Sequence, residues 1–315
     1  MIANPRKATS PLIILFIGIL AVSAASLLIR FAQREAPSLV IAAFRMTIAA
    51  LLVAPFCMKT FINEIKAASG STRFLLGLSG LFLAFHFASW ITSLEYTSVA
   101  SSVVLVTTAP LWVALLSPIF LNEKITRWIL FGLAISLLGS IVVGISSACS
   151  IQTGKWACEN MSELFHGRAL LGNALALAGA FLSAGYLMVG RKVRDKVSLS
   201  TYIFAVYSTS AMVLLLLVCI NGEKLTGYSP QTYLWLLGLA LIPQIIGHSA
   251  FNWALKYLSA AYVSIALLGE PIGTVILTMI FLRESPSALE LVGGGLILLG
   301  ILVATRSQRT KQVVG

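Results

Sequence analysis

The second half of this chain repeats part of the first half. Residues 75–139 align without a gap onto residues 236–300, a shift of 161 positions, and 19 of the 65 aligned pairs are identical. The identical pairs include Tyr96 with Tyr257, Pro110 with Pro271, Glu123 with Glu284, Gly132 with Gly293 and Gly139 with Gly300. If each half holds an odd number of membrane spans, the halves must be inverted relative to each other. A site between inverted halves is typical of secondary transporters.

The composition indicates a membrane protein. Hydrophobic residues make up 58% and charged residues 10% of the sequence, whereas a soluble domain has about 25% charged residues. The net charge of +11 does not indicate a nucleic-acid partner. The basic residues lie in short clusters between apolar runs of roughly 20 residues, the length that crosses a bilayer, and not on one soluble face. The three His and four Cys have no zinc spacing, and we expect neither a metal nor a cofactor.

We expect an all-α membrane protein with ten transmembrane helices, arranged as two inverted five-helix repeats. Every span must be helical, because unpaired backbone groups are costly in lipid. The predicted spans are 11–31, 38–57, 74–94, 98–121, 127–147, 169–190, 199–220, 231–255, 259–282 and 287–305. The predicted domains are a first repeat (11–147), an outside loop (148–168), a second repeat (169–305) and a cytoplasmic tail (306–315).

The distribution of Lys and Arg predicts the orientation. With the N-terminus inside, the inside segments hold 15 of these residues, the outside segments hold 6, and Arg45 lies within a span. The positive-inside rule therefore places both termini in the cytoplasm, and we expect a multi-pass protein of the bacterial inner membrane. The first apolar run, of about 18 residues, exceeds the apolar region of a signal peptide, so we expect an uncleaved first helix.

Two cysteines share the predicted outside loop. Cys149 and Cys158 are separated by eight residues, which is enough chain to close a ring. An oxidising compartment would favour a disulfide between them. Two free thiols are the alternative.

Two residues of opposite charge lie inside predicted spans, Arg45 in the second and Glu270 in the ninth. A charge at the bilayer centre costs about 2.5–3.5 kcal/mol on insertion scales and usually faces a cavity or a partner. Both lie at similar depth, so they either form a permanent ion pair or hold the two ends of a zwitterionic substrate. Glu270 precedes Pro271, which loosens the helix. Because burial favours the neutral form of a carboxyl group, Glu270 is also a candidate for proton coupling.

Polar and aromatic residues in other spans are further candidates for substrate binding. They are His86, Trp90, Thr108, Trp112, Gln244, His248 and Asn252. His86 and Trp90 lie one turn apart and face the same way. Gln244, His248 and Asn252 recur every four residues and form one polar face of a helix, which is unfavourable in contact with lipid. The alternatives are an interfacial belt for the tryptophans, hydrogen bonds between helices for the polar residues, and a bond to its own helix backbone for Thr108.

Two acids follow the fourth and ninth predicted spans at equivalent places on opposite sides of the membrane. They are Glu123 and Glu284. An acid near a helix N-terminus meets favourable dipole charge. We therefore interpret both residues as structural or gate elements and not as substrate ligands.

Short motifs recur in both halves. Residues 109–116 read APLWVALL, residues 120–124 read FLNEK, residues 269–273 read GEPIG, and residues 281–284 read FLRE. With Phe44-Arg45 in the second span, these motifs resemble the EamA-type transporters of the drug/metabolite transporter superfamily over roughly residues 12–305. The resemblance implies two inverted five-helix repeats and a central cavity lined mainly by spans three, four, eight and nine. It also implies movement of small metabolites, often amino acids, amines or carboxylates.

The sequence favours a secondary transporter that exports a small polar metabolite by alternating access at a midplane cavity. The expected partners are a small-molecule substrate and membrane lipid, and we expect no enzymatic activity. A primary pump is disfavoured, because the chain has no phosphate-binding loop. The alternatives are an intramembrane enzyme, for which no zinc motif, nucleophile motif or cluster of acids is present, and a receptor that binds ligand without transport. The sequence leaves the substrate, the coupling and the oligomeric state open.

The depth of Glu270 generates a first prediction. Replacement Glu270→Gln should lower transport far more than Glu290→Gln, which changes an acid at the start of the tenth predicted span, because a buried carboxyl group next to a proline is suited to a site. The measurement is flux by both variants at matched membrane levels. Equal activity of the two variants would remove Glu270 from the site.

Overall fold

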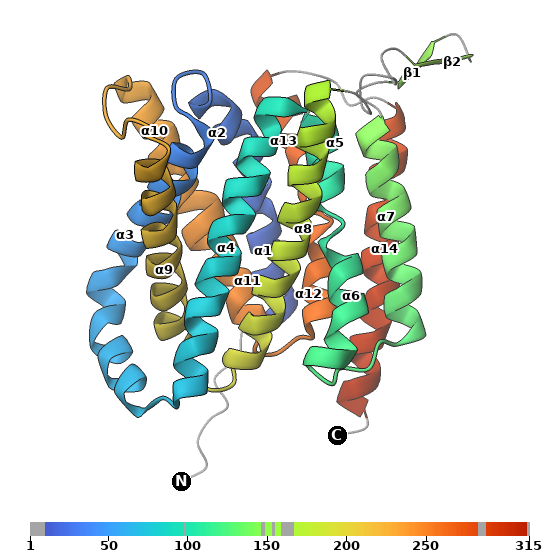
Figure 1. Ribbon diagram of the computed structural model, residues 1–315. Coiled ribbons are helices and arrows are strands. Elements are labelled where there is room, and N and C mark those ends of the chain that lie inside the picture. Colours follow the sequence, from blue (N-terminus) through green and yellow to red (C-terminus); the bar gives the residue numbers. More distant parts are fainter. Residues whose placement is uncertain are drawn as a thin grey trace.

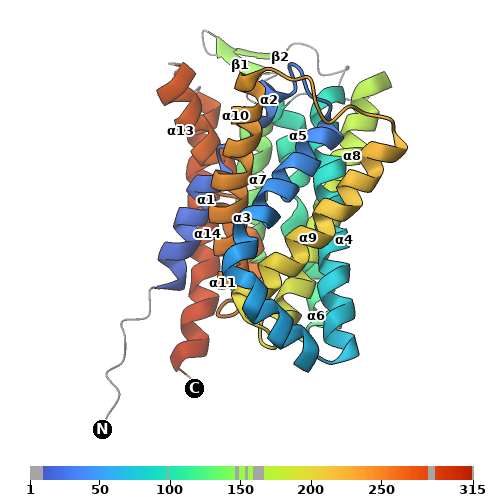
Figure 2. The same ribbon diagram turned by 90° about the vertical axis from the view of Figure 1, so that its left-hand side faces the viewer.

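The computed structural model is a bundle of helices with one short β-hairpin. It describes residues 10–97, 99–145, 149–152, 155–158, 167–282 and 288–313. The helices run side by side between two ends (Figure 1). We call the end that carries the hairpin the upper end, and the end where α14 finishes at Val313 the lower end. Helix α1 begins toward the lower end as well (Figure 2), so the start of α1 and the end of α14 lie on the same side.

The order of elements follows the chain from one half to the other. The first half holds α1 (Pro11–Val22), α2 (Ala25–Ala32), α3 (Ser38–Ala67), α4 (Gly70–Tyr96), α5 (Val99–Val106), α6 (Ala109–Phe120) and α7 (Arg127–Ile145). The hairpin consists of β1 (Cys149–Gln152) and β2 (Lys155–Cys158). The second half holds α8 (Gly167–Val193), α9 (Leu199–Ile220), α10 (Pro230–Leu239), the π-helix η2 (Ala240–His248), α11 (Ser249–Ala254), α12 (Ala260–Leu267), α13 (Glu270–Leu282) and α14 (Ala288–Val313).

Six helical segments of the described residues are long and apolar enough to cross a membrane. They are Pro11–Ala32, Ser38–Ala67, Gly70–Tyr96, Arg168–Val193, Leu199–Ile220 and Pro230–Ala254. Ala109–Phe120, Arg127–Gly139 and Leu291–Ala304 are shorter apolar helices. Apart from the hairpin, which was not predicted, the prediction of an all-helical membrane bundle is confirmed.

Several predicted spans are interrupted helices. The span predicted at 98–121 is divided into α5 and α6 at residues 107–108, and the span predicted at 259–282 is divided into α12 and α13 at residues 268–269. The two interruptions lie 161 residues apart, which is the shift that relates the repeats. They are therefore equivalent features of the two halves.

Prolines explain these interruptions. Pro110 and Pro271 each stand second in the helix that follows the break. A proline has no N–H to donate, and its ring clashes with the carbonyl group one turn earlier. In the predicted span 231–255, Pro243 lies inside the π-helix η2, a rare form that occurs frequently at functional sites.

The seam between α7 and α14 shows how the repeats are related. The two helices run in opposite directions (Figure 1). Ser136 donates a hydrogen bond to the carbonyl group of Ile297, its own equivalent in the second repeat (3.3 Å). The close glycine contacts are Gly132 with Gly300 and Gly139 with Gly293. Exchanging the repeats converts one glycine contact into the other, so an axis of pseudo-twofold symmetry passes through this seam.

Carboxylates from one helix end cap the N-terminus of another helix. Glu35 accepts a hydrogen bond from the backbone N–H of Ser229 (2.9 Å), Glu64 from that of Ser198 (2.9 Å), and Glu95 from that of Ser38 (3.1 Å). These N–H groups lie at the starts of α10, α9 and α3, where the first donors of a helix lack partners and the dipole favours an anion. The backbone hydrogen bond from Ser229, supported by hydroxyl groups, holds the pKa of the Glu35 carboxyl group below its usual value.

The hairpin places the two loop cysteines opposite each other. Strands β1 and β2 are antiparallel, and their register pairs Cys149 with Cys158. Directly opposed residues of an antiparallel pair are close enough for their side chains to meet. The backbone is therefore compatible with the disulfide, which stays a prediction.

The glycine seam generates a second prediction. A Cβ atom at Gly300 would lie 2.6 Å from the carbonyl oxygen of Gly132, whereas a Cβ atom at Gly295 of the same helix would meet no atom within 4 Å. Gly300→Ala should therefore destabilise the protein by about 1–3 kcal/mol through overpacking. Gly295→Ala should be neutral or slightly stabilising, because alanine favours a helix over glycine.

The measurement is the thermal unfolding midpoint of the two purified variants in detergent. A Gly300→Ala midpoint equal to that of Gly295→Ala would contradict the close approach of the helices.

Candidate functional site

A cavity lies at the level of the two helix interruptions. Thr107, Ala109 and Pro110 line it beside the first interruption, and Leu268 and Glu270 line it beside the second. The space is about 570 Å³ when its open mouth is included. Irregular backbone at membrane depth is tolerated where protein or a water-filled cavity surrounds it, so the position of the breaks and the position of the cavity agree.

The cavity straddles the axis that relates the repeats. Its lining includes equivalent pairs, 161 residues apart: Val22 with Ser183, Val106 with Leu267, Thr107 with Leu268, and Ala109 with Glu270. The frame is therefore symmetric. The chemistry is not, because Ser183 and Glu270 are polar and their counterparts are apolar.

Five of the nine predicted binding residues line this cavity. They are Arg45 of α3, His86 and Trp90 of α4, His248 of η2, and Glu270 of α13. They come from four elements that are distant in the chain, and they bring both a cation and an anion to one space. Such convergence of polar groups in a largely apolar cavity is typical of a small-molecule site.

Arg45 is fully buried and is held by two neighbours. Its Nε atom donates a hydrogen bond to Oε1 of Gln244 (2.9 Å), and its guanidinium carbon lies 4.1 Å from the ring centre of Phe87. Its Nη1 atom is buried without a hydrogen-bond partner. The side chain is therefore fixed in place, yet part of its donor capacity is unused.

Arg45 and Glu270 do not form the permanent ion pair that was one alternative. The two residues line the same cavity. Among the described residues, however, no carboxylate lies within the 4 Å that defines an ion pair with Arg45. Glu270 opens α13 and is only half-buried. The structure therefore keeps the opposite charges apart inside one space.

His86 and Trp90 form one wall of the cavity. Their rings are stacked, with centres 5.9 Å apart and planes 12° apart. The Nδ1 atom of His86 lies 2.9 Å from the carbonyl oxygen of Gly179. A carbonyl group only accepts, so Nδ1 carries the hydrogen, and in the neutral ring Nε2 is an acceptor. The indole Nε1 atom of Trp90 is buried without a partner.

The other four predicted residues lie outside the cavity lining. Gln244 and Asn252 are fully buried; Gln244 orients Arg45, and Asn252 accepts a hydrogen bond from the hydroxyl group of Tyr186 (2.7 Å). The Trp112 ring packs edge-on against Phe181, with ring centres 5.4 Å apart. Thr108 donates to the carbonyl group of Leu105 in its own turn (2.6 Å), which is the alternative that its sequence position left open.

Sequence reasoning missed Ser183 of α8, which lines the cavity. Nothing around it in the sequence marks it as special. Its equivalent in the first repeat, Val22, also lines the cavity, so projecting lining positions from one repeat onto the other could have found it. Among the described residues, no three His, Cys, Asp or Glu residues gather in a way that could hold a metal ion.

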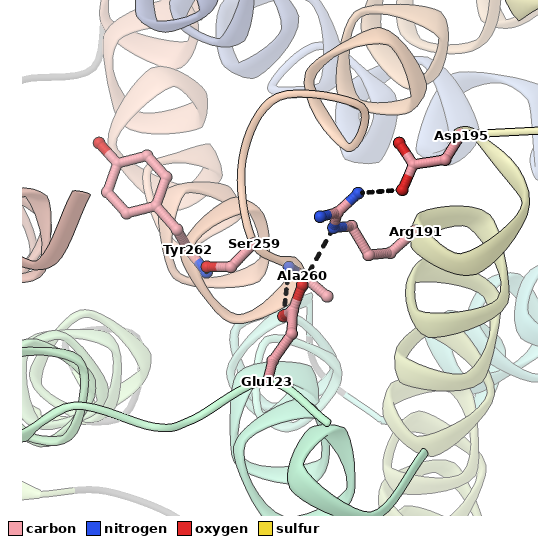
Figure 3. Close-up of polar contacts among 6 residues, drawn as sticks. All are labelled: Glu123, Arg191, Asp195, Ser259, Ala260 and Tyr262. Carbon is pink, nitrogen blue, oxygen red and sulfur yellow. Dashed lines mark hydrogen bonds and ion pairs between the residues drawn. The ribbon is translucent and has the colours of Figure 1, made fainter. Parts of the chain in front are cut away.

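Below the cavity, a polar cluster joins three helices (Figure 3). Glu123, just after α6, forms an ion pair with Arg191 of α8 (Oε1 to Nε, 3.0 Å) and accepts a hydrogen bond from the backbone N–H of Ala260 at the start of α12 (3.3 Å). Arg191 also pairs with Asp195 (3.1 Å). Asn122 has a positive φ of 53°, a conformation that asparagine tolerates, and it ends α6 so that Glu123 can reach both partners.

This cluster joins the two halves at the lower end. Glu123 belongs to the first repeat, whereas Arg191 and Ala260 belong to the second. Helices α6 and α12, which line the cavity from below, also contact each other. Glu284, the equivalent of Glu123, lies outside the described residues.

Comparison with known proteins agrees with this architecture. The chain matches the model of the EamA-like transporter family twice, over residues 9–145 and 170–306. A solved structure titled only as the crystal structure of a protein has a TM-score of 0.74, covers 95% of this chain and 98% of its own, and is 18% identical in sequence, so it supports the fold alone.

Several curated relatives are named transporters. An uncharacterized transporter of Archaeoglobus fulgidus is 27% identical over 290 residues (89% of this chain and 93% of the relative). The uncharacterized transporter YdfC of Bacillus subtilis is 24% identical over 259 residues (81% and 77%). The probable terminal-alkyne amino-acid exporter of Streptantibioticus cattleyicolor is 22% identical over 264 residues (83% and 82%). With both repeats matched across almost its whole length, the chain belongs to the EamA-like transporter family and is an integral membrane protein.

Proposed function

We propose that this protein is a secondary transporter that moves a small polar metabolite of the amino acid, amine or organic acid class. The observation that carries the proposal is the cavity, where Arg45 and Glu270, which have no ion pair among the described residues, face one space between inverted halves. Charged residues held at membrane depth are costly and mark substrate pathways. Export is supported by the relative named as an amino-acid exporter, although that name describes the relative and its own substrate.

The proposed membrane arrangement has ten transmembrane helices in two five-helix domains, 11–147 and 169–305. Six long apolar segments and the interrupted or shorter helices between them support this count. The clusters of Lys and Arg favour a cytoplasmic lower end, which puts both termini in the cytoplasm of a bacterial cell and the hairpin outside.

The proposed mechanism is alternating access. At the lower end, α6 and α12 contact each other and the Glu123 cluster joins the two repeats. At the upper end, the described residues of α5 and α13 have no comparable contact. We therefore infer an outward-facing conformation, from which separation of α6 and α12 would open the cavity to the cytoplasm.

The proposal is tested by metabolite comparison followed by reconstitution. Cells with and without the protein are compared by untargeted analysis of accumulated metabolites, and the strongest difference is tested as flux in proteoliposomes. Substrate-dependent flux, without chemical change of the solute, is the expected result. Formation of a product would favour an intramembrane enzyme, and binding without flux would favour a receptor.

The lower cluster generates a further prediction. Replacement Glu123→Gln removes the charge that pairs with Arg191 and should shift the protein toward a conformation open at the lower end. The readout is labelling of a reporter, Ser264→Cys on the cavity wall, in a chain without its own cysteines. A membrane-impermeant thiol reagent is applied from the cytoplasmic side, and a several-fold faster labelling rate is expected.

Asp195→Asn is the matched control for that experiment. Asp195 bonds the same arginine, but its side chain is 59% exposed, and exposed ion pairs contribute little, typically about 0–1 kcal/mol. Its labelling rate should stay close to that of the parent. Unchanged labelling in Glu123→Gln, in protein that is folded and inserted, would show that the cluster does not hold the lower end closed.

A further inference from the structure

The unused hydrogen-bonding groups around the cavity share one chemical character. In the described part of the chain, six buried side-chain nitrogen atoms have no hydrogen-bond partner: Arg45 Nη1, Trp90 Nε1, Trp112 Nε1, Gln244 Nε2, His248 Nδ1 and Asn252 Nδ2. Five of these are donors and cannot accept, and the histidine nitrogen depends on the tautomer. The cavity region therefore has an excess of donors.

Part of this excess lies at the cavity itself. Arg45, Trp90 and His248 line the space directly, and Gln244 is bonded to Arg45. The buried oxygen atoms without a partner among the described residues belong to Ser26, Thr47, Ser117 and Glu223, and none of these residues lines the cavity. Unsatisfied buried donors are few in native proteins and cost about 1–3 kcal/mol each, so an acceptor that reaches these donors gains hydrogen bonds.

The orientation of the Gln244 amide is fixed by its neighbour. A guanidinium group has donors and no acceptor, so Oε1 of Gln244 must face Arg45, as the 2.9 Å hydrogen bond shows. The Nε2 atom then points away as a donor. Arg45 and Gln244 consequently act as a unit that carries one positive charge and two unused donors, Nη1 and Nε2.

Glu270 gives the same cavity a group of complementary charge. Glu270 brings a carboxylate to the same space, with no ion pair to Arg45 among the described residues. A second anionic group on a bound solute would meet this carboxylate and be repelled. Aromatic rings accompany these charges: His86 and Trp90 line the cavity stacked on each other, and Phe87 lies under the guanidinium group.

We propose that Arg45, held in place by Gln244, and His248 form an oxyanion subsite that binds the single carboxylate, or a chemically comparable oxyanion, of the transported solute. An oxygen of such a group accepts from Arg45 Nη1, and charge-assisted hydrogen bonds of this kind are the strong ones. The remainder of the solute lies along the aromatic wall toward Glu270. Solutes that carry an amine but no carboxylate or other oxyanion lack the group that this subsite binds. The inference rests on the proposed transport function, because it concerns the same cavity.

The test measures binding, not flux. Purified protein in detergent is exposed to probes that share an apolar body and differ in one group: phenylacetate, phenylmethanesulfonate, phenylphosphonate, phenethylamine and phenylacetamide, with acetate and propionate as smaller carboxylates. Binding is followed by the shift of the thermal midpoint and by the change in intrinsic tryptophan fluorescence, to which Trp90 of the cavity wall contributes. Carboxylates are expected to bind more tightly than the matched amine and amide, and the sulfonate and phosphonate arms show whether the subsite prefers carboxylate or accepts other oxyanions.

The decisive variant is Gln244→Glu, which keeps the shape of the side chain and its bond to Arg45. It supplies the anion internally and removes two donor hydrogens, so it should weaken carboxylate binding about tenfold or more, the loss expected for one charge-assisted hydrogen bond. Gln231→Glu adds the same charge at an exposed position of α10 and should leave binding unchanged. Arg45→Gln is a second variant, expected to lose carboxylate binding entirely.

Several outcomes would overturn the oxyanion subsite. They are tighter binding of the amine than of the carboxylates, undiminished carboxylate binding by folded Gln244→Glu, and failure of every oxyanion in the panel to bind. The proposed transport function can fail independently of the subsite. If carboxylates bind in a way that depends on Gln244 but no bound solute crosses the membrane of proteoliposomes, the subsite stands and transport is refuted.

Discussion

The need to satisfy backbone hydrogen bonds in hydrocarbon controls this structure. A continuous helix forms these hydrogen bonds within itself, whereas an interruption exposes N–H and C=O groups with which lipid cannot form hydrogen bonds. The chain places its interruptions at 107–108 and 268–269 against an internal cavity. Prolines at 110 and 271 enforce the breaks. Because an interrupted helix must lie beside protein or water, the same residues that weaken two helices also determine where a polar site can exist.

Symmetry and asymmetry have different roles in the bundle. The contact of Ser136 with its equivalent Ile297, and the exchanged glycine contacts beside it, join the halves along a twofold seam. The cavity inherits this symmetry, because several of its lining positions are equivalent pairs. Its charges break the symmetry, since Glu270 corresponds to Ala109 in the first repeat. In the proposed transporter, the symmetric frame would present two similar access routes, while the asymmetric side chains would give the solute one preferred orientation.

Much of the fold could be predicted from the sequence, and less of the site. Helix positions follow from apolar runs, and the inverted halves follow from the 161-residue shift, because both are repeated local patterns. The residues lining the cavity could be predicted where a polar residue stands alone in an apolar run, as Arg45, His86 and Glu270 do. The role of Gln244 as the partner of Arg45 could not, because the two are 199 residues apart and meet only through packing. For Trp112 and Thr108 the prediction from the sequence was a place in the site. In the structure, Thr108 bonds the backbone of its own helical turn and Trp112 packs against Phe181.

The separation of Arg45 from Glu270 connects stability with function. A closed ion pair in this space would neutralise both charges at the cost of desolvating them, and breaking such a pair leaves a buried charge uncompensated. The structure instead holds Arg45 with the neutral Gln244 amide and the face of Phe87. These contacts orient the guanidinium group without consuming its charge. In the proposed oxyanion subsite, the unused donor of Arg45 bonds a solute that carries an acceptor and gains nothing from one that does not, and this difference in affinity is what selectivity requires.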